Sequence, residues 1–145
     1  MSKKKRKRVI VDMSATLIHH GHIRILKKAK KFGKVIVALT KDSEIKKFKG
    51  YTPELNYSQR KEIIRAIRYV DEVIPSNFFL DEKFLNKHKI KLLIHGNDHN
   101  NKVDKKYVVT FKRTKNISSA ILRKKAMKCL KKIKINRNKD IVFRY

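Results

Sequence analysis

The sequence predicts an α/β fold in which one doubly wound parallel sheet organises a single domain. Short runs of Val, Ile and Leu alternate along the chain with segments whose apolar residues recur every three or four positions. The runs suit buried parallel strands, and the periodic segments suit helices that cover a sheet. The 145 residues contain no internal repeat and no Pro-rich or Ser-rich linker. We therefore expect residues 1–135 to form one domain and residues 136–145 to form a basic C-terminal tail.

The first part of the chain predicts a βαβ unit. A β-branched run at residues 8–11 predicts a strand, and the spacing of apolar side chains over residues 23–32 predicts a helix. Gly33 follows this helix, and we expect it to act as the C-cap. Residues 35–39 form a continuous apolar run, which is typical of a central parallel strand.

The rest of the chain continues the alternation. Residues 41–56 are polar and lysine-rich and contain Gly50 and Pro53, so we expect a loop there. The remaining expected elements are a helix at residues 58–69, a strand at 73–75, a helix at 81–88, strands at 91–95 and 107–111, and a helix that begins near Ser118. Right-handed crossovers would join these strands into a parallel sheet.

The formal net charge of +28 favours anionic partners. Only ten of the 40 basic residues are arginine, however, and the lysines are spread along the whole chain, whereas nucleic-acid readers favour arginine and use aromatic residues for stacking. We therefore interpret most lysines as solvated surface that also steers anionic substrates, and we do not expect nucleic acid as a partner.

Composition also indicates a cytoplasmic protein. Cys129 is the single cysteine, so the chain cannot form an internal disulfide, and no Cys/His cluster resembles a zinc site. Residues 3–8 have the charge of a signal peptide, but the apolar run that follows is too short. No stretch approaches the roughly 18 apolar residues of a membrane span.

The motif His19-x-Gly21-His22 is a candidate anion site. It follows the first expected strand, at the carboxyl edge of the sheet, where ligands bind in this architecture. Gly21 would let the backbone approach a phosphate, and both imidazoles and the N–H groups of the helix start could donate hydrogen bonds. Taken alone, the two histidines would be better interpreted as exposed polar residues of a loop. We expect no metal ligands, because no nearby carboxylate or cysteine completes a site.

Further sequence blocks occur in the order found in one known family. They are Asp42 with Lys46 and Lys49-Gly50, Gln59-Arg60, residues 67–75, Gly96-Asn97-Asp98 and residues 113–119. With these blocks the chain resembles the cytidylyltransferase branch of the HxGH nucleotidyltransferase superfamily, nearest to glycerol-3-phosphate and ethanolamine-phosphate cytidylyltransferases. The combination of HxGH with an RTxxIS-type segment that opens a C-terminal helix is specific.

The resemblance implies a Rossmann-like sheet and a particular reaction. The phosphate of a small phosphorylated alcohol or amine would attack the α-phosphate of CTP in line, giving a CDP-linked product and pyrophosphate without a covalent enzyme intermediate. Mg²⁺ would accompany the triphosphate, and the chain would form a homodimer. An adenylyltransferase that uses ATP, or a degenerate non-catalytic domain that binds a nucleotide or another polyanion, remains an alternative.

The resemblance also implies roles for individual residues. His19, His22 and Arg113 would contact the triphosphate, and Lys46 and Lys49 would hold the reacting phosphates. The residues expected to bind the nucleotide are Ser14, Gly21, Arg68, Gly96, Asp98, Thr114, Ser118 and Ser119.

The assignment of Asp98 decides the choice of nucleotide, and the assignments of Arg60 and Arg68 have alternatives. Asp98 would accept a hydrogen bond from the cytosine amino group, which is the reason to prefer CTP. Arg60 is expected to bind the second substrate, although Arg60 and Arg68 could instead form surface ion pairs with Glu62 and Asp71.

The sequence departs from the family pattern at two places. Residues 13–16 read Met-Ser-Ala-Thr where the family usually has Gly-Thr-Phe-Asp, so Met13 replaces a glycine and Thr16 replaces an acidic residue. Asn116 stands where the RTxGIS segment has glycine. Because Asn tolerates the left-handed backbone conformation, we expect this turn to survive.

Overall fold

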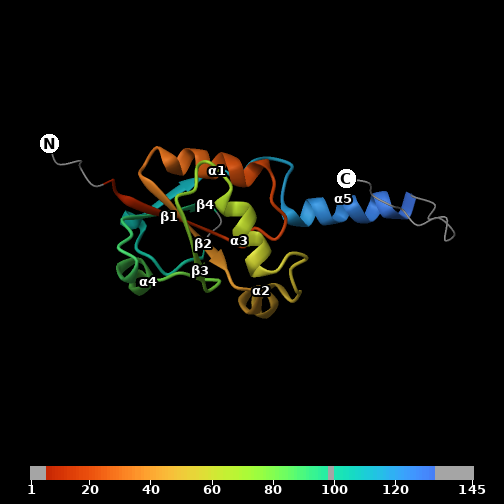
Figure 1. Ribbon diagram of the computed structural model, residues 1–145, viewed down its shortest axis with the longest axis horizontal. Helices are drawn as coiled ribbons and strands as arrows, with labels where there is room; N and C mark the ends of the chain where they lie inside the picture. The colour runs from red at the N-terminus through yellow and green to blue at the C-terminus, as the bar shows by residue number, and fades with distance from the viewer. Residues whose placement is uncertain (1–5, 98–99, 133–145) are drawn as a thin grey trace.

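The computed structural model describes residues 6–97 and 100–132, and the strands within them form one five-stranded parallel sheet of order β3-β2-β1-β4-β5 (Figure 1). The strands are β1 Arg8–Met13, β2 Lys34–Thr40, β3 Glu72–Ser76, β4 Leu92–Gly96 and β5 Val108–Phe111. In the register of the sheet, Val11 lies between Val37 and Ile94. The strand order reverses between β1 and β4, which confirms the doubly wound, Rossmann-like fold.

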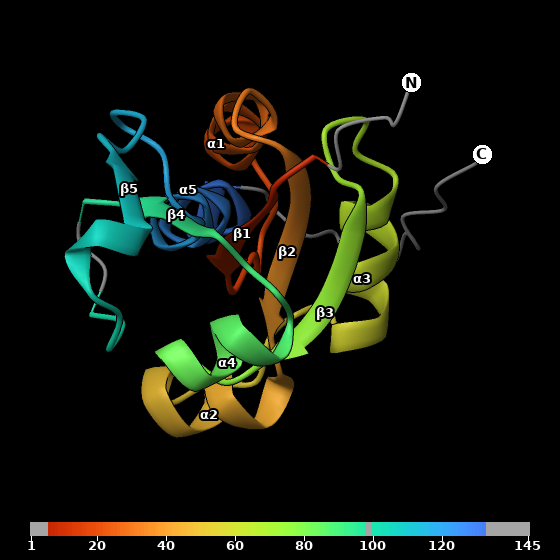
Figure 2. The same cartoon turned by 90° about the vertical axis from the view of Figure 1, so that its left-hand side faces the viewer.

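Helices cover both faces of the sheet. On one face, α1 (His20–Lys30) and α3 (Tyr57–Arg65) bury apolar side chains against the odd-numbered residues of β1. On the other face, α4 (Glu82–Lys87) packs against Ile10, which is why α1 and α4 lie on opposite sides of the strands in Figure 2. The bounds of α1 and α4 and the start of α5 agree with the expected helices to within three residues, whereas α3 ends at Arg65, before the expected residue 69.

The last helix, α5 (Ser119–Lys132), projects away from the body of the molecule (Figure 1). None of its residues is buried. No helix in the described part of the chain is long and apolar enough to cross a membrane. The tail expected at residues 136–145 lies outside the described residues.

The expectation of a loop throughout residues 41–56 was wrong, because helix α2 (Asp42–Lys49) occupies the first part. Acidic residues in its first turn and lysines in its last turn complement the helix dipole. Gly50 ends the helix in the left-handed conformation, with φ of 76°. The sequence shows almost no helical periodicity of apolar residues here, because Ile45 is the single fully buried residue of α2.

Gly33 does not cap α1, contrary to expectation. Lys31 is the C-cap, in the right-handed conformation. The glycine is needed because the backbone passes so close to β1 that a Cβ at Gly33 would lie 2.1 Å from the carbonyl oxygen of Lys7. That carbonyl accepts a hydrogen bond of 2.8 Å from the N–H of Lys34, at the start of the β1–β2 pairing.

We expect Gly33→Ala to lower the free energy of unfolding by about 1–3 kcal/mol, because the backbone must move to admit the methyl group. Urea denaturation would measure the loss. Gly50→Ala is the control: a Cβ there meets nothing within 4 Å, so only the positive φ should cost about 1 kcal/mol. An unchanged urea midpoint for Gly33→Ala would contradict the close approach.

Candidate active site at the carboxyl edge of the sheet

A cleft of about 700 Å³ opens at the carboxyl edge of the sheet. Its walls come from the turn after β1, the start of α1, the segments that follow α2, β3 and β4, and the segment that connects β5 to α5. The cleft includes the carboxyl ends of β1 and β4, where the strand order reverses, which is the usual ligand position in open parallel sheets.

The side chains of His19 and His22 together cap helix α1. The Nδ1 atom of His19 accepts a hydrogen bond of 3.1 Å from the N–H of Gly21, and the Nδ1 atom of His22 accepts one of 3.1 Å from the N–H of His19. A backbone N–H can only donate, so neither Nδ1 atom carries a proton. In the neutral rings the proton must therefore lie on Nε2, where it is available to a ligand.

Gly21 is required for this arrangement. A Cβ at this position would lie 2.8 Å from Cε1 and 2.9 Å from Nδ1 of His19. Any larger residue would therefore push the His19 ring away from the helix start. Gly21, the third residue of the HxGH motif, therefore leaves room for the His19 ring and would also let the backbone approach a ligand.

The surroundings of the two rings disfavour a positive charge on them. Burial, then the charges of His19 and Arg113, lowers the pKa of His22 from 6.5 to about 4. Burial, then the charges of His20 and Arg113, lowers the pKa of His19 as well. Both rings are therefore neutral hydrogen-bond donors at neutral pH.

The start of α5 forms the opposite wall. Ser118 caps the helix by accepting a hydrogen bond of 3.1 Å from the N–H of Ile121. The hydroxyl of Ser119 donates to the carbonyl of Leu17 at 3.1 Å and accepts from the N–H of the same residue at 3.3 Å. Asn116 has φ of 60°, which confirms that this turn uses the left-handed conformation.

The cleft is strongly cationic. Its basic lining residues are Arg24, Lys28, Lys49, Lys112, Arg113 and Arg123. Asp12 is the one carboxylate among the described residues that line it. Desolvation lowers the pKa of the Lys49 ammonium, and the charges of Arg123 and Arg113 act in the same direction. Such a cleft suits a ligand with several negative charges.

Most of the site residues expected from the sequence line this cleft. Those brought together are Ser14, His19, Gly21, His22, Lys49, Gly96, Arg113, Thr114, Ser118 and Ser119. Lys46 is exposed on α2 and does not line the cleft, and exposed Arg68 donates to the Tyr69 hydroxyl at 2.9 Å. Asp98 lies outside the described residues.

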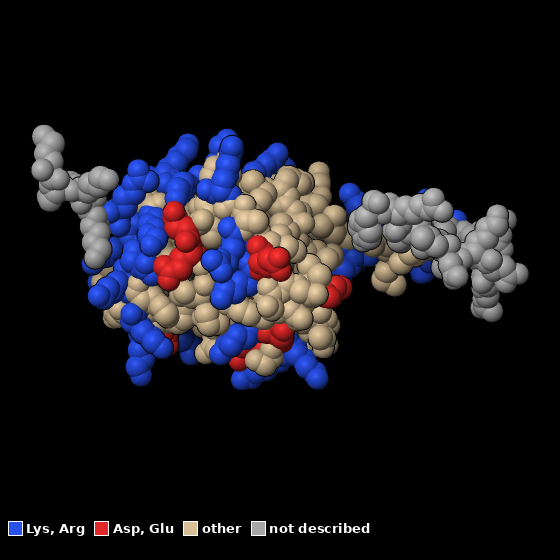
Figure 3. Space-filling model, in the orientation of Figure 1, with Lys and Arg blue, Asp and Glu red and all other residues tan. Residues whose placement is uncertain are grey.

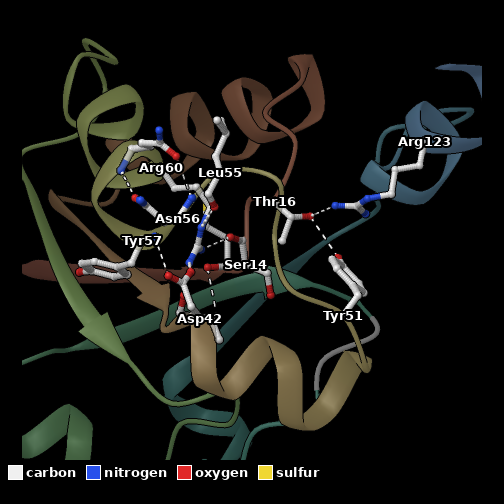
Figure 4. Close-up of polar contacts among 12 residues, drawn as sticks. Ser14, Thr16, Asp42, Tyr51, Leu55, Asn56, Tyr57, Arg60 and Arg123 are labelled. Atoms are coloured by element: carbon white, nitrogen blue, oxygen red, sulfur yellow. Dashed lines mark hydrogen bonds and ion pairs between the residues drawn. The ribbon is translucent and has the colours of Figure 1, made fainter.

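Arg60 does not line the cleft, and its side chain lies among Ser14, Asp42 and Leu55 (Figure 4). Its side chain is fully buried, and it donates to the carbonyl oxygens of Leu55, Ser14 and Thr40 at 3.1, 2.6 and 2.9 Å. A carboxylate oxygen of Asp42 lies 2.6 Å from its Nη2 atom. Arg60 therefore has a structural role, because every nitrogen of its guanidinium donates to the protein. The expected contact with the substrate and the alternative ion pair with Glu62 were both wrong.

The sequence interpretation missed a polar group at the ends of β1 and β4. A carboxylate oxygen of Asp12 lies 3.4 Å from Nε2 of His95, and the other accepts a hydrogen bond of 2.9 Å from Asn101. An acidic residue at the end of an apolar strand was the available signal. The interpretation also missed Tyr51 and Arg123, which line the cleft but belong to none of the family blocks used above.

We expect Arg60→Leu to lower the free energy of unfolding by about 3–5 kcal/mol, because it leaves buried carbonyl oxygens and Asp42 without their donor. Urea denaturation would measure the change. Arg68→Leu, on the exposed surface, is the matched control and should stay within about 0.5 kcal/mol of the wild type. A loss below about 1 kcal/mol for Arg60→Leu would contradict the role assigned to this arginine.

We expect the low pKa of His22 to make folding pH-dependent. Its pKa of about 4 in the folded state lies below the ordinary 6.5, so the unfolded state binds more protons between these values. As the pH falls from 6.5 to 4, the free energy of unfolding of the wild type should fall by about 2–4 kcal/mol more than that of His22→Gln. Gln is the chosen replacement because it can maintain the capping box of α1. Parallel pH profiles of the two proteins would contradict the assignment.

Comparison with known proteins identifies the family. A family model described as Cytidylyltransferase-like matches residues 14–127. The chain is 37% identical over 121 residues to glycerol-3-phosphate cytidylyltransferase of Staphylococcus aureus (strain NCTC 8325 / PS 47), covering 78% of this chain and 89% of that protein. It is 43% identical over 75 residues to FAD synthase of Pyrococcus abyssi (strain GE5 / Orsay), covering 51% of each.

A solved structure supports the fold. The lipopolysaccharide core biosynthesis protein from Thermoplasma volcanium GSS1 superimposes with a TM-score of 0.59 at 23% identity, covering 86% of this chain and 88% of that one. From the matched family model and the identity to these relatives, the chain belongs to the cytidylyltransferase-like family of nucleotidyltransferases.

Proposed function

We propose that this protein transfers CMP from CTP to a small phosphorylated alcohol or amine and releases pyrophosphate. The observation that carries the proposal is that Nδ1 of His19 and of His22 accepts a backbone hydrogen bond, which leaves Nε2 of both rings as the donor at the start of a helix in a cationic cleft. The similarity to a glycerol-3-phosphate cytidylyltransferase over most of the chain supports CTP and a phosphorylated alcohol.

In this reaction an oxygen of the acceptor's phosphate forms a bond to the α-phosphorus of CTP while the bond to the pyrophosphate oxygen breaks. The acceptor oxygen is already anionic, so the protein need not remove a proton from it. Negative charge accumulates instead on the departing pyrophosphate. Pre-positioned donors stabilise that charge, which is the role we assign to His19 and His22.

The other cleft residues would hold the remaining phosphates. Backbone N–H groups at the start of α5, next to Ser118 and Ser119, favour a phosphate. Arg113 can bind phosphate oxygens in a bidentate manner. Lys49, across the cleft, would hold the acceptor's phosphate next to the α-phosphate. The binding of both substrates in one cationic cleft would supply the proximity that the reaction needs.

Mg²⁺ would enter with the nucleotide. No group of three or more His, Cys, Asp or Glu side chains in the described residues could hold a metal ion. Mg²⁺ commonly takes its ligands from substrate phosphates, waters and one or two carboxylates, which fits a cleft with Asp12 as its carboxylate. When bound, it would offset part of the triphosphate charge.

Adenylyl transfer from ATP is the second candidate, favoured by the 43% identity to an FAD synthase over half of the chain. The same phosphate contacts would serve either nucleotide, because they do not touch the base. The two candidates therefore differ in the nucleotide that supports turnover.

The test is release of pyrophosphate from MgCTP or MgATP with a panel of phosphorylated alcohols and amines. We expect turnover with CTP, and we expect His22→Ala to lower kcat by about 10²–10³-fold, because it removes one donor to the leaving group. His20→Ala is the matched control: His20 is exposed, lies outside the cleft and should keep the wild-type rate.

Turnover with ATP alone would favour the adenylyltransferase. No pyrophosphate with either nucleotide and any acceptor, or a full rate for His22→Ala, would contradict the proposal.

A further inference from the structure

The guanidinium of Arg123 on α5 joins three segments that surround the cleft (Figure 4). It binds both carboxylate oxygens of Glu54, with Nη2 to Oε2 at 2.6 Å. The same Nη2 atom donates to the hydroxyl of Thr16 at 2.9 Å. Its Cζ atom lies 4.5 Å from the centre of the Tyr51 ring. The turn after β1, the segment between α2 and α3, and α5 therefore meet at one side chain.

The contacts reinforce one another. Thr16 is 1% exposed, and its oxygen also lies 3.3 Å from the Tyr51 hydroxyl. The hydrogen bond from Arg123 lowers the pKa of Glu54, and the same bond raises the pKa of Arg123, so both groups are charged. A cation–π contact with the Tyr51 ring accompanies the hydrogen bonds to Glu54 and Thr16.

These contacts determine where the chain runs after α2. Residues 50–55 connect Gly50, which ends α2, to Asn56, which caps α3. Arg60 holds the far end of this connection through the carbonyl of Leu55. Arg123 contacts its middle through Tyr51 and Glu54, on either side of the buried Pro53.

Lys49 immediately precedes this connection and lines the cleft. Its ammonium lies close enough to Tyr51 and Arg123 for their charges to affect its pKa. Because Lys49 is the last residue of α2, the helix fixes its backbone, and Tyr51 can influence only where the flexible Lys49 side chain points.

We propose that Arg123 is a positioning residue that holds residues 50–55 against the turn at Thr16 and thereby keeps Tyr51 where it directs the Lys49 side chain into the cleft. Its kinetic consequence rests on the function proposed above; the structural claim does not. Thr16 suits this task because a hydroxyl takes one N–H of the guanidinium and leaves two for Glu54. A carboxylate at position 16 would compete with Glu54 for the same cation.

The kinetic test is a double-mutant cycle on Arg123→Gln and Lys49→Ala, with kcat/KM measured for the acceptor at saturating CTP. We expect Arg123→Gln to lower kcat/KM about tenfold, since small displacements of a binding group are costly. The kcat/KM of the double variant should equal that of Lys49→Ala alone, because Arg123→Gln acts through Lys49. Multiplicative losses would mean that Arg123 contacts the substrate itself and would overturn the proposal.

Glu54→Gln separates positioning from direct contact, because Glu54 does not line the cleft. It should lower kcat/KM in the same direction as Arg123→Gln. The matched control is Lys124→Gln, an exposed neighbour on α5 outside the cleft, which should keep the wild-type value. Wild-type kinetics in both Glu54→Gln and Arg123→Gln would overturn the proposal.

A second measurement does not depend on turnover. In ¹⁵N relaxation experiments on the full chain, order parameters of the amides of residues 50–52, 54 and 55 should fall from about 0.85 to below about 0.6 in Arg123→Gln but not in Lys124→Gln. If Arg123→Gln loses this order but the wild type turns over no substrate, the positioning role is supported and the proposed function is contradicted. Unchanged order parameters would overturn the positioning role whatever the activity.

Discussion

The capping of helix α1 by two histidine side chains is the interaction on which the site depends. The hydrogen bonds that start the helix occupy Nδ1 of His19 and His22 and so assign the ring protons to Nε2. Burial and the nearby charge of Arg113 then oppose a second proton on each ring. A structural cap therefore supplies neutral donors at the positive end of a helix, a combination that favours phosphate without adding a titrating charge.

Two arginines fix the segments around this cap. Buried Arg60 joins the carbonyl oxygens of Ser14 and Thr40 to the segment before α3, and Arg123 joins the same segment to Thr16 and α5. The remaining positive charge is spread over the surface, and in Figure 3 Lys and Arg cover much of the end opposite α5. Most of the described lysines are exposed, as expected for solvated surface.

The sheet and the position of the site followed from local sequence, because apolar runs and strand-to-helix turns are short-range signals. The features that were missed depend on distant partners. Gly33 is needed because of Lys7, and Arg60 is buried because the carbonyl oxygens of Ser14 and Thr40, distant in sequence, accept its hydrogen bonds. Helix α2 was missed because a single buried side chain gives almost no periodicity.

The central claim is that His19 and His22 present protons on Nε2 to the cleft. Long-range ¹H–¹⁵N NMR of the histidine rings tests it directly. The account predicts, at neutral pH, unprotonated Nδ1 and protonated Nε2 in both rings, a titration of His22 only near pH 4, and a shift of both Nε2–H signals on addition of MgCTP. A proton on Nδ1 of either ring, or titration of His22 near its ordinary value of 6.5, would contradict the account.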